Sequence, residues 1–274
     1  MLETKVIVDK TDLTYLKWSH IRSSSGTAGS FLKSESSLDG KKRYFKLSNF
    51  DPVNGVLGHE CVNEIIVDRL LTVLGVEHIH YELINSIIDV DGREYETWLC
   101  CSEDFKNKGE SKTALDNYYI ANSLPGESHY DFCVRMGWKS YVDTMIAVDY
   151  LILNRDRHGA NIEVLRNARA KELRLAPLFD HGLSLMYSCS NEKEIMAYDI
   201  MEDKRCQNFI GSTSCFENLR LIGDKSDRQR VFPNRLNKSD REFIFSELDR
   251  ILHDYFIDKL WDMIFTRYRT YEDF

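Results

Sequence analysis

Three side chains suited to holding a metal ion and a reacting hydroxyl group lie within residues 153–185. Asp156 and Asn161 are five positions apart in LNRDRHGANIEVL (153–165), a glycine-containing loop that runs into a strand-like segment. Asp180 ends the strand-like part of LRLAPLFDHGLSL (173–185). Phosphoryl transfer needs such a set, because one carboxylate orients the attacking hydroxyl while an amide oxygen and a second carboxylate hold Mg²⁺ against a triphosphate. Asp156 fits the first role, and Asn161 and Asp180 fit the second.

Each of these residues also has an ordinary structural interpretation. An isolated DxxxxN pattern is common in proteins, and Asp156 alone is compatible with the cap of a turn. We interpret His158 as a hydrogen-bonded structural residue and Arg157 as the ion-pair partner of a nearby carboxylate. The order of features favours the chemical interpretation: a glycine-bearing loop, a strand lysine, a helix glutamate, a hairpin, a buried helix, DxxxxN and then DxG.

A lysine and a glutamate upstream are predicted to form a buried ion pair. Lys46 lies in KKRYFKLSNF (41–50), and strand alternation turns its side chain toward the protein interior, where it needs an anionic partner. Glu60 and Glu64 lie one turn apart on the next predicted helix. We predict pairing with Glu64 rather than Glu60; the alternative is that all three are solvated.

The elements that must position these residues fall into two groups. A β-rich region has predicted strands at 4–9, 16–22, 30–34, 42–48, 80–90 and 94–101, a helix at 58–75, and an Asp91-Gly92 hairpin turn. After about residue 105 helices dominate: 141–154, apolar on nearly all sides, and two amphipathic helices within 239–268, with Ser239 as an N-cap. This pattern predicts an α+β fold with a β-rich N-lobe carrying one helix (1–105) and a mainly helical C-lobe (106–274).

Composition limits the class of protein. The chain has 274 residues and 43% hydrophobic content, enough for a sizeable core. With no apolar run of eighteen residues and no charged-then-apolar leader, we expect a cytoplasmic protein without a membrane partner, secretion by a non-standard route being left open. The net charge of -8 disfavours nucleic acid as a direct partner. Seven cysteines without a CxxC pair predict no disulfide framework, and adjacent Cys100 and Cys101 are expected on opposite faces of a strand.

The segments NRDRHGAN and LAPLFDHGLSL resemble the catalytic and metal-binding segments of HipA-like serine/threonine kinases, including compact toxin-type members. The resemblance runs from the serine-rich loop to DxG and implies a two-lobed protein-kinase-like fold that uses ATP and Mg²⁺. It implies Asp156 as the catalytic aspartate, Asn161 and Asp180 as Mg²⁺ ligands, Lys46 on the α- and β-phosphates and Glu64 as the helix glutamate. In WLCCSEDF, Glu103 and Phe105 match the acidic-x-aromatic pattern of the interlobe hinge, which places main-chain groups against adenine.

The serine-rich loop SSSGTAGSFLK (23–33) then has a predicted role. Loops of this composition are most often surface loops without a ligand. The resemblance favours a phosphate-binding hairpin in which the backbone around Ser25, Gly26, Thr27 and Gly29 contacts ATP, since glycine permits close approach. The family often continues with Gln-x-Lys, which this loop lacks. Serines before this glycine are modified in the family, so we predict that Ser23 or Ser25 is autophosphorylated and that the phosphate lowers activity.

The sequence thus predicts an ATP-dependent serine/threonine protein kinase with an unidentified protein substrate. DRHxxN also occurs in phosphoinositide kinases, so a lipid or small-molecule kinase is one alternative, although residues 183–215 are too acidic for a membrane-facing segment. An inactive kinase-like binding module is another, but no metal ligand or lysine is missing. Full-length HipA has a subdomain ahead of the loop, where only 22 residues precede it here. One expectation is therefore that a small partner protein supplies the missing subdomain. The other is that nothing replaces it.

Overall fold

The N-terminal part of the chain is built on a mixed five-stranded sheet. The structure, a computed structural model, describes residues 4–19, 31–38 and 40–274. The strand order is β1-β6-β7-β3-β2, with β1 parallel to β6 and the other neighbours antiparallel. These strands are β1 (Lys5–Asp12), β2 (Lys33–Leu38), β3 (Lys41–Leu47), β6 (Tyr81–Val90) and β7 (Arg93–Glu103), and a short hairpin of β4 (Phe50–Asp51) and β5 (Gly55–Val56) precedes the first helix.

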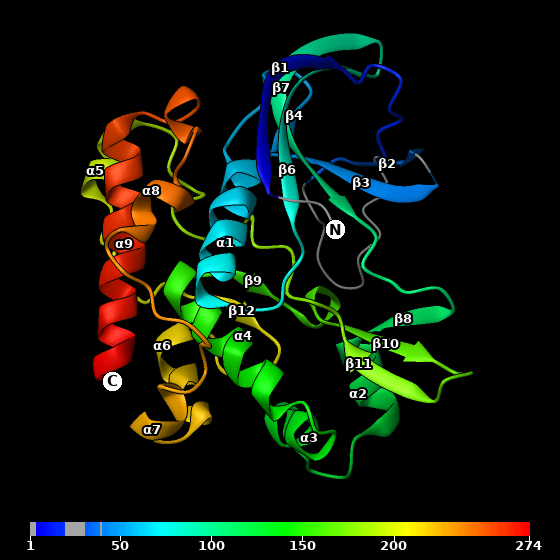
Figure 1. Ribbon diagram of the computed structural model, residues 1–274, viewed down its shortest axis with the longest axis vertical. Coiled ribbons are helices and arrows are strands. Elements are labelled where there is room, and N and C mark those ends of the chain that lie inside the picture. Colours follow the sequence, from blue (N-terminus) through cyan, green and yellow to red (C-terminus); the bar gives the residue numbers. More distant parts are fainter. Residues whose placement is uncertain (1–3, 20–30, 39) are drawn as a thin grey trace.

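The first helix, α1 (Glu60–Leu74), covers one face of this sheet and lies between it and the helices that follow (Figure 1). Its apolar residues recur at helical spacing, and Ile66 and Leu70 are fully buried. The helix ends at Gly75, whose φ of 72° is left-handed, while the Val76 N–H donates to the Leu71 carbonyl at 2.9 Å. The predicted helix and its glycine stop are confirmed.

The remainder of the chain is mainly helical, and its described residues also include a three-stranded and a two-stranded sheet. The three-stranded sheet has the order β11-β10-β8. The two-stranded sheet consists of β9 and β12, which pair in parallel. The long helices α4 and α9 pack against each other, with α9 along the outer side in Figure 1. The elements in this part are β8 (Glu110–Ala114), α2 (Leu115–Asn122), α3 (His129–Arg135), α4 (Lys139–Ile152), β9 (Asp156–Arg157), the 3-10 turn η1 (Gly159–Asn161), β10 (Glu163–Asn167), β11 (Glu172–Leu175), α5 (Glu192–Ala197), β12 (Gln207–Asn208), α6 (Cys215–Asn218), η2 (Leu219–Ile222), α7 (Lys225–Arg228), α8 (Asp240–Ile244), η3 (Leu248–Arg250) and α9 (Asp254–Asp273).

Two hydrophobic clusters lie on opposite faces of the five-stranded sheet. The larger cluster joins α1 to the helical part and includes Leu83 and Cys100. The smaller one covers the other face and includes Ile84 and Cys101. Adjacent strand residues therefore belong to different clusters, as strand alternation requires. All seven cysteines are buried and free, so the predictions of packing cysteines and of no disulfide framework are confirmed.

Some predicted elements are wrong in extent. Residues 16–19 form no strand beyond an isolated bridge between Ser19 and Lys33, and 20–22 lie outside the described residues. The strand predicted at 30–34 is instead β2, which begins at Lys33 because its polar residues pair along β3. The predicted C-terminal helices are divided by Glu247, whose φ of 64° is left-handed, and the Ser239 side chain makes no capping hydrogen bond.

The α+β fold class is confirmed, while the division into lobes at residue 105 stays a prediction. The Asp91-Gly92 turn has positive φ at both residues and joins β6 to β7, so the predicted hairpin turn is confirmed. Within the described residues, none of the helices combines the length and the apolar character that crossing a bilayer requires.

Candidate active site

The predicted ion pair between Lys46 and Glu64 is present and includes Asp180. Phe45 and Leu47 on β3 face the smaller cluster, so Lys46 points to the opposite side, toward α1. Its Nζ lies 2.9 Å from Glu64 Oε1 and 2.5 Å from Asp180 Oδ1. Burial alone would lower the pKa of Lys46, but the charges of Asp180 and Glu64 outweigh it and raise the pKa well above its usual value. Lys46 is therefore a permanent cation held between two carboxylates.

The predicted choice of Glu64 over Glu60 is supported by the contacts of each side chain. Glu60 Oε2 accepts the Asn49 N–H at 3.2 Å. Glu64 is fully buried, and its second oxygen accepts the His181 N–H at 2.8 Å. One carboxylate thus links β3, α1 and the residue after Asp180.

The segment carrying Asp156 is anchored by a buried ion pair. Arg157 is fully buried, and its guanidinium donates to the Asp149 carboxylate on α4, with Nη2 at 3.0 Å from Oδ1. Its Nη1 donates to the carbonyls of Asn161 and Phe179 at 3.3 and 3.0 Å. The interpretation of Arg157 as a structural cation is confirmed. The same side chain fixes the ends of both segments that carry candidate site residues.

Asp156 and Asn161 lie together within this segment. The Asn161 Nδ2 donates to the Asp156 carbonyl at 2.8 Å, which turns its Oδ1 away from that carbonyl. Burial raises the pKa of the Asp156 carboxyl, and the nearby His158 offsets only part of the effect. His158 Nε2 lies 3.8 Å from Asp156 Oδ2, too far for a hydrogen bond but close enough to act on its charge.

Asp180 adopts a backbone conformation that is uncommon outside glycine. Its φ is 58°, in the left-handed region that aspartate tolerates better than most residues. The Asn63 Nδ2 holds the following turn by donating to the carbonyls of Gly182 and Ser184, both at 3.0 Å. Burial would raise the pKa of the Asp180 carboxyl, but the charges of Lys46 and Lys33 outweigh it and hold the pKa well below its usual range. Asp180 is therefore an ionised carboxylate.

A cavity of about 400 Å³ opens beside these groups. Lys46, Asn161 and Asp180 all line it, and Asp156 is joined to Asn161 by the hydrogen bond to its carbonyl. The charged part of the cavity continues into a wall of apolar and aromatic residues: Ile79, Tyr81, Ala114 and Phe179. This combination of convergent charged groups and an apolar wall is typical of a small-molecule site.

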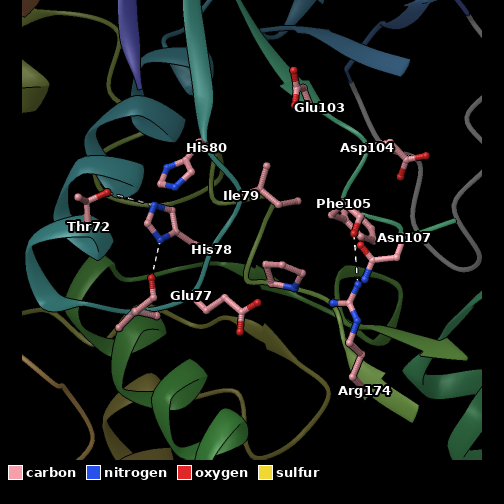
Figure 2. A pocket seen from close by; sticks show the side chains of 12 residues that line it. Thr72, Glu77, His78, Ile79, His80, Glu103, Asp104, Phe105, Asn107 and Arg174 are labelled. Carbon is pink, nitrogen blue, oxygen red and sulfur yellow. Dashed lines mark hydrogen bonds between the residues drawn. The ribbon is translucent and has the colours of Figure 1, made fainter. Parts of the chain in front are cut away.

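The predicted hinge residues Glu103 and Phe105 also line this cavity. The Phe105 ring stacks on Phe179, with 5.6 Å between centroids. The Phe105 carbonyl accepts a hydrogen bond from Arg174 Nη2 at 3.3 Å, and Figure 2 shows Phe105 and Arg174 side by side. Among the described residues, the Phe105 N–H has no hydrogen-bond partner. It is therefore a main-chain donor available to a ligand.

The donor set fits Mg²⁺, which prefers hard oxygen ligands. Asn161 Oδ1 and Asp180 Oδ2 have no hydrogen-bond partner among the described residues, and both residues line the cavity. The sequence analysis identified the two candidate metal ligands, Asn161 and Asp180, as well as Lys46, Glu64 and Asp156. It missed the residues that hold these side chains in place, namely Asn63, Tyr81, Asp149 and Asn154. An aspartate among the otherwise apolar residues 145–152 was nevertheless a visible signal. The loop residues Ser23, Ser25, Gly26, Thr27 and Gly29 lie outside the described residues.

Gly159 is the residue at which the segment carrying Asn161 is most sensitive to added volume. A Cβ at this position would lie 2.5 Å from the Asp116 Cβ and 3.0 Å from its backbone nitrogen. We expect Gly159→Ala to lower the free energy of unfolding by about 1–3 kcal/mol, since a packed neighbour must move. Denaturant unfolding measures this loss. Asp116→Gly in the same chain should recover part of it, and an unchanged stability of the single variant would contradict the contact.

Comparisons with known proteins show a structural likeness over nearly the whole chain. CtkA, a proinflammatory kinase of Helicobacter pylori, superimposes with a TM-score of 0.67 at 16% identity, over 96% of this chain and 97% of its own. HipA of Shewanella oneidensis MR-1, solved with HipB and operator DNA, gives a TM-score of 0.45 at 14% identity, over 90% of this chain and 67% of its own, which is too low to carry an argument. No protein-family model matches the chain, and neither does any curated protein.

Proposed function

We propose that this chain, which has the fold of the CtkA kinase, is an ATP-dependent serine/threonine protein kinase that transfers the γ-phosphoryl group of ATP to a protein hydroxyl. The observation that carries the proposal is the convergence of Lys46, Asn161 and Asp180 on one cavity, with Asp156 beside it. The serine/threonine choice rests on the sequence resemblance. The protein acceptor remains to be found by experiment.

In this proposal two lysines bind the phosphates of ATP. Lys33 on β2 lies directly opposite Lys46 on β3, and both line the cavity. Like charges facing each other across two strands are unfavourable on their own. A polyphosphate between them removes the repulsion, which supports this end of the cavity as the phosphate end.

Asn161 and Asp180 would hold Mg²⁺ through their side-chain oxygens. When bound, the ion would neutralise negative charge on the phosphate oxygens. Asp180 is already ionised, so it needs no proton loss to act as a ligand. Lys46 fixes its Oδ1 and leaves Oδ2 for the ion.

Asp156 would orient the acceptor hydroxyl and take its proton. β12 pairs with β9 on both sides of this residue, since the Gln207 N–H donates to the Arg155 carbonyl and the Phe209 N–H to the Arg157 carbonyl, both at 2.9 Å. The segment at 207–209 is thereby held beside Asp156. It is the part of the described chain best placed to support an acceptor peptide.

The adenine ring would occupy the apolar end of the cavity, with the Phe105 N–H as a main-chain donor. Two lobes divided at residue 105, 1–105 and 106–274, would then close on the nucleotide, with Glu103 and Phe105 at the hinge. The loop around Ser25, Gly26, Thr27 and Gly29 would cover the phosphates. Autophosphorylation at Ser23 or Ser25 and a small partner protein at the N-terminal side belong to the same proposal.

The test of the Mg²⁺ role is nucleotide binding by Asp180→Asn. We expect this variant to lose most of the Mg²⁺-dependent part of its ATP affinity, because an amide oxygen is a weaker ligand for a hard cation than a carboxylate. Titration of a fluorescent ATP analogue with and without Mg²⁺ measures the difference. Asp9→Asn, on the exposed side of β1, is the matched control and should bind as wild type does. Equal Mg²⁺ dependence in Asp180→Asn and wild type would contradict the assignment.

A further inference from the structure

A second group of ligand-type side chains lies at the C-terminal end of α1, away from the candidate active site. Asp68 is on α1, and His78 and His80 lie just before β6. Their ligand atoms all fall within 4.8 Å of one another. The two histidines are two residues apart in an extended segment, so their rings share a side. Figure 2 shows both rings against α1, beside Thr72.

The hydrogen-bond partners of His78 leave its Nε2 facing a carboxylate. Its Nδ1 lies 2.6 Å from the Val76 carbonyl oxygen and its Nε2 lies 2.7 Å from Asp68 Oδ1. Both of these partners are acceptors, whereas a neutral imidazole has one N–H. The Thr72 hydroxyl lies farther from Nε2, at 3.4 Å, and the His78 side chain is only 3% exposed. A metal ion between Nε2 and Asp68 Oδ1 would satisfy both atoms.

The third ligand atom faces the same carboxylate oxygen. His80 Nδ1 lies 2.9 Å from Asp68 Oδ1. The Asp68 side chain is 0% exposed, so one buried carboxylate oxygen faces two ring nitrogens. One divalent ion between these atoms would give all three of them a partner.

The neighbouring backbone fixes the orientation of these groups. The Val76 carbonyl holds Nδ1 of His78 and so directs Nε2 toward Asp68. The Tyr81 N–H donates to Asp68 Oδ2 at 2.7 Å and leaves Oδ1 for the histidines. Metal-binding histidines and carboxylates commonly have such outer hydrogen bonds, which set the tautomer and the direction of the ligand atom.

We propose that Asp68, His78 and His80 bind one divalent transition-metal ion of the Zn²⁺ type. Two imidazole nitrogens and one carboxylate oxygen favour such ions over Mg²⁺ or Ca²⁺. In a tetrahedral site with bonds of 2.0–2.2 Å, ligand atoms lie about 3.3 Å apart, so the side chains need to separate by about half an ångström. His80 is 30% exposed, and both histidines line a cavity of about 680 Å³ with the acidic residues Glu77 and Asp104 (Figure 2). This cavity leaves the fourth position open to water or a ligand.

The ion would fix two elements that carry the candidate active site. Asp68 lies one turn after Glu64 on α1. The Ile79 N–H donates to the Leu178 carbonyl at 2.9 Å, two residues before Asp180. The metal would therefore join the helix bearing Glu64 to the strand connection that supports Asp180. The site itself does not depend on kinase activity, because its binding is measured without nucleotide.

The experiment is a competition titration of the chelator-treated full chain with Zn²⁺, in the presence of excess Mg²⁺ and a chromophoric zinc chelator. We expect one equivalent of Zn²⁺ to bind and to raise the melting temperature. His80→Gln and His78→Gln should each weaken binding by more than about 100-fold, beyond the 10–100-fold cost of losing an outer contact. His253→Gln, an exposed histidine ahead of α9, is the matched control and should bind as wild type does.

Two further arms separate this site from other zinc ligands. Asp180→Asn should retain Zn²⁺ binding, which excludes the candidate Mg²⁺ position. Co²⁺ in place of Zn²⁺ should give the visible absorption of a four-coordinate nitrogen and oxygen site. Failure of the wild type to bind a stoichiometric ion would overturn the proposal, and so would unchanged affinity in both His78→Gln and His80→Gln.

Discussion

Asp156→Asn should abolish phosphoryl transfer while leaving ATP affinity nearly unchanged. The carboxylate acts on the acceptor hydroxyl, and Asp156 is not among the residues that line the cavity, so its loss acts on the transition state rather than on bound nucleotide. Loss of a general base costs about 10²–10⁴-fold in rate. The measurement is the initial rate of γ-phosphoryl transfer alongside ATP titration of the same preparation.

The control for Asp156→Asn is Asp262→Asn, an exposed aspartate on α9. It should retain both the rate and the affinity. If Asp156→Asn transferred phosphate at the wild-type rate to every acceptor tested, Asp156 would have no catalytic role. If it lost ATP affinity in proportion to rate, its role would lie in nucleotide binding.

Lys46→Met should reduce both stability and nucleotide binding. Its removal leaves Glu64, which is fully buried, and Asp180 without their shared cation. Removing one partner of a buried ion pair costs about 3–5 kcal/mol, because the remaining charge is uncompensated. Denaturant unfolding should show a loss of this order, and ATP affinity should fall with it. Lys42→Met, on the same strand with its side chain 41% exposed, should change neither.

The double variant Lys46→Met/Glu64→Gln separates the two effects. It removes the charge of Glu64, the fully buried one of the two stranded carboxylates, so stability should return part of the way to wild type. ATP affinity stays low because no cation replaces Lys46. A double variant as unstable as Lys46→Met would show that the ion pair is not the source of the stability loss. Full ATP affinity in Lys46→Met would show that another lysine holds the phosphates.

The candidate site was largely readable from the sequence because its signals are local. Strand alternation turned Lys46 inward, helical spacing put Glu64 on the buried side of α1, and the buried charge then required their pairing. Arg157 had the same need for a carboxylate. Asp149 was visible as an aspartate among apolar residues, but its pairing with Arg157 was not identifiable, because that contact depends on how α4 packs against the following loop.

The strands were less predictable where they form only because a neighbouring strand is available to pair with them. β2 and β8 are rich in serine, lysine and glutamate, which have low strand propensity, and they form strands because β3 and β10 offer them partners. The cluster at Asp68 shows the same limit. His78 and His80 are visible as an HxH pattern, but Asp68 joins them only when α1 packs on β6.

The central claim is tested most directly by incubating the full chain with γ-labelled ATP and Mg²⁺, alone and with a cell lysate, and mapping the labelled residues by mass spectrometry. The account predicts Mg²⁺-dependent label on serine or threonine of the chain or of lysate proteins, with Ser23 or Ser25 as the site on the chain itself, and none with Asp156→Asn. Label on lipid or small molecules alone would make the chain another kind of kinase. Absence of any label that depends on Asp156 would contradict the account.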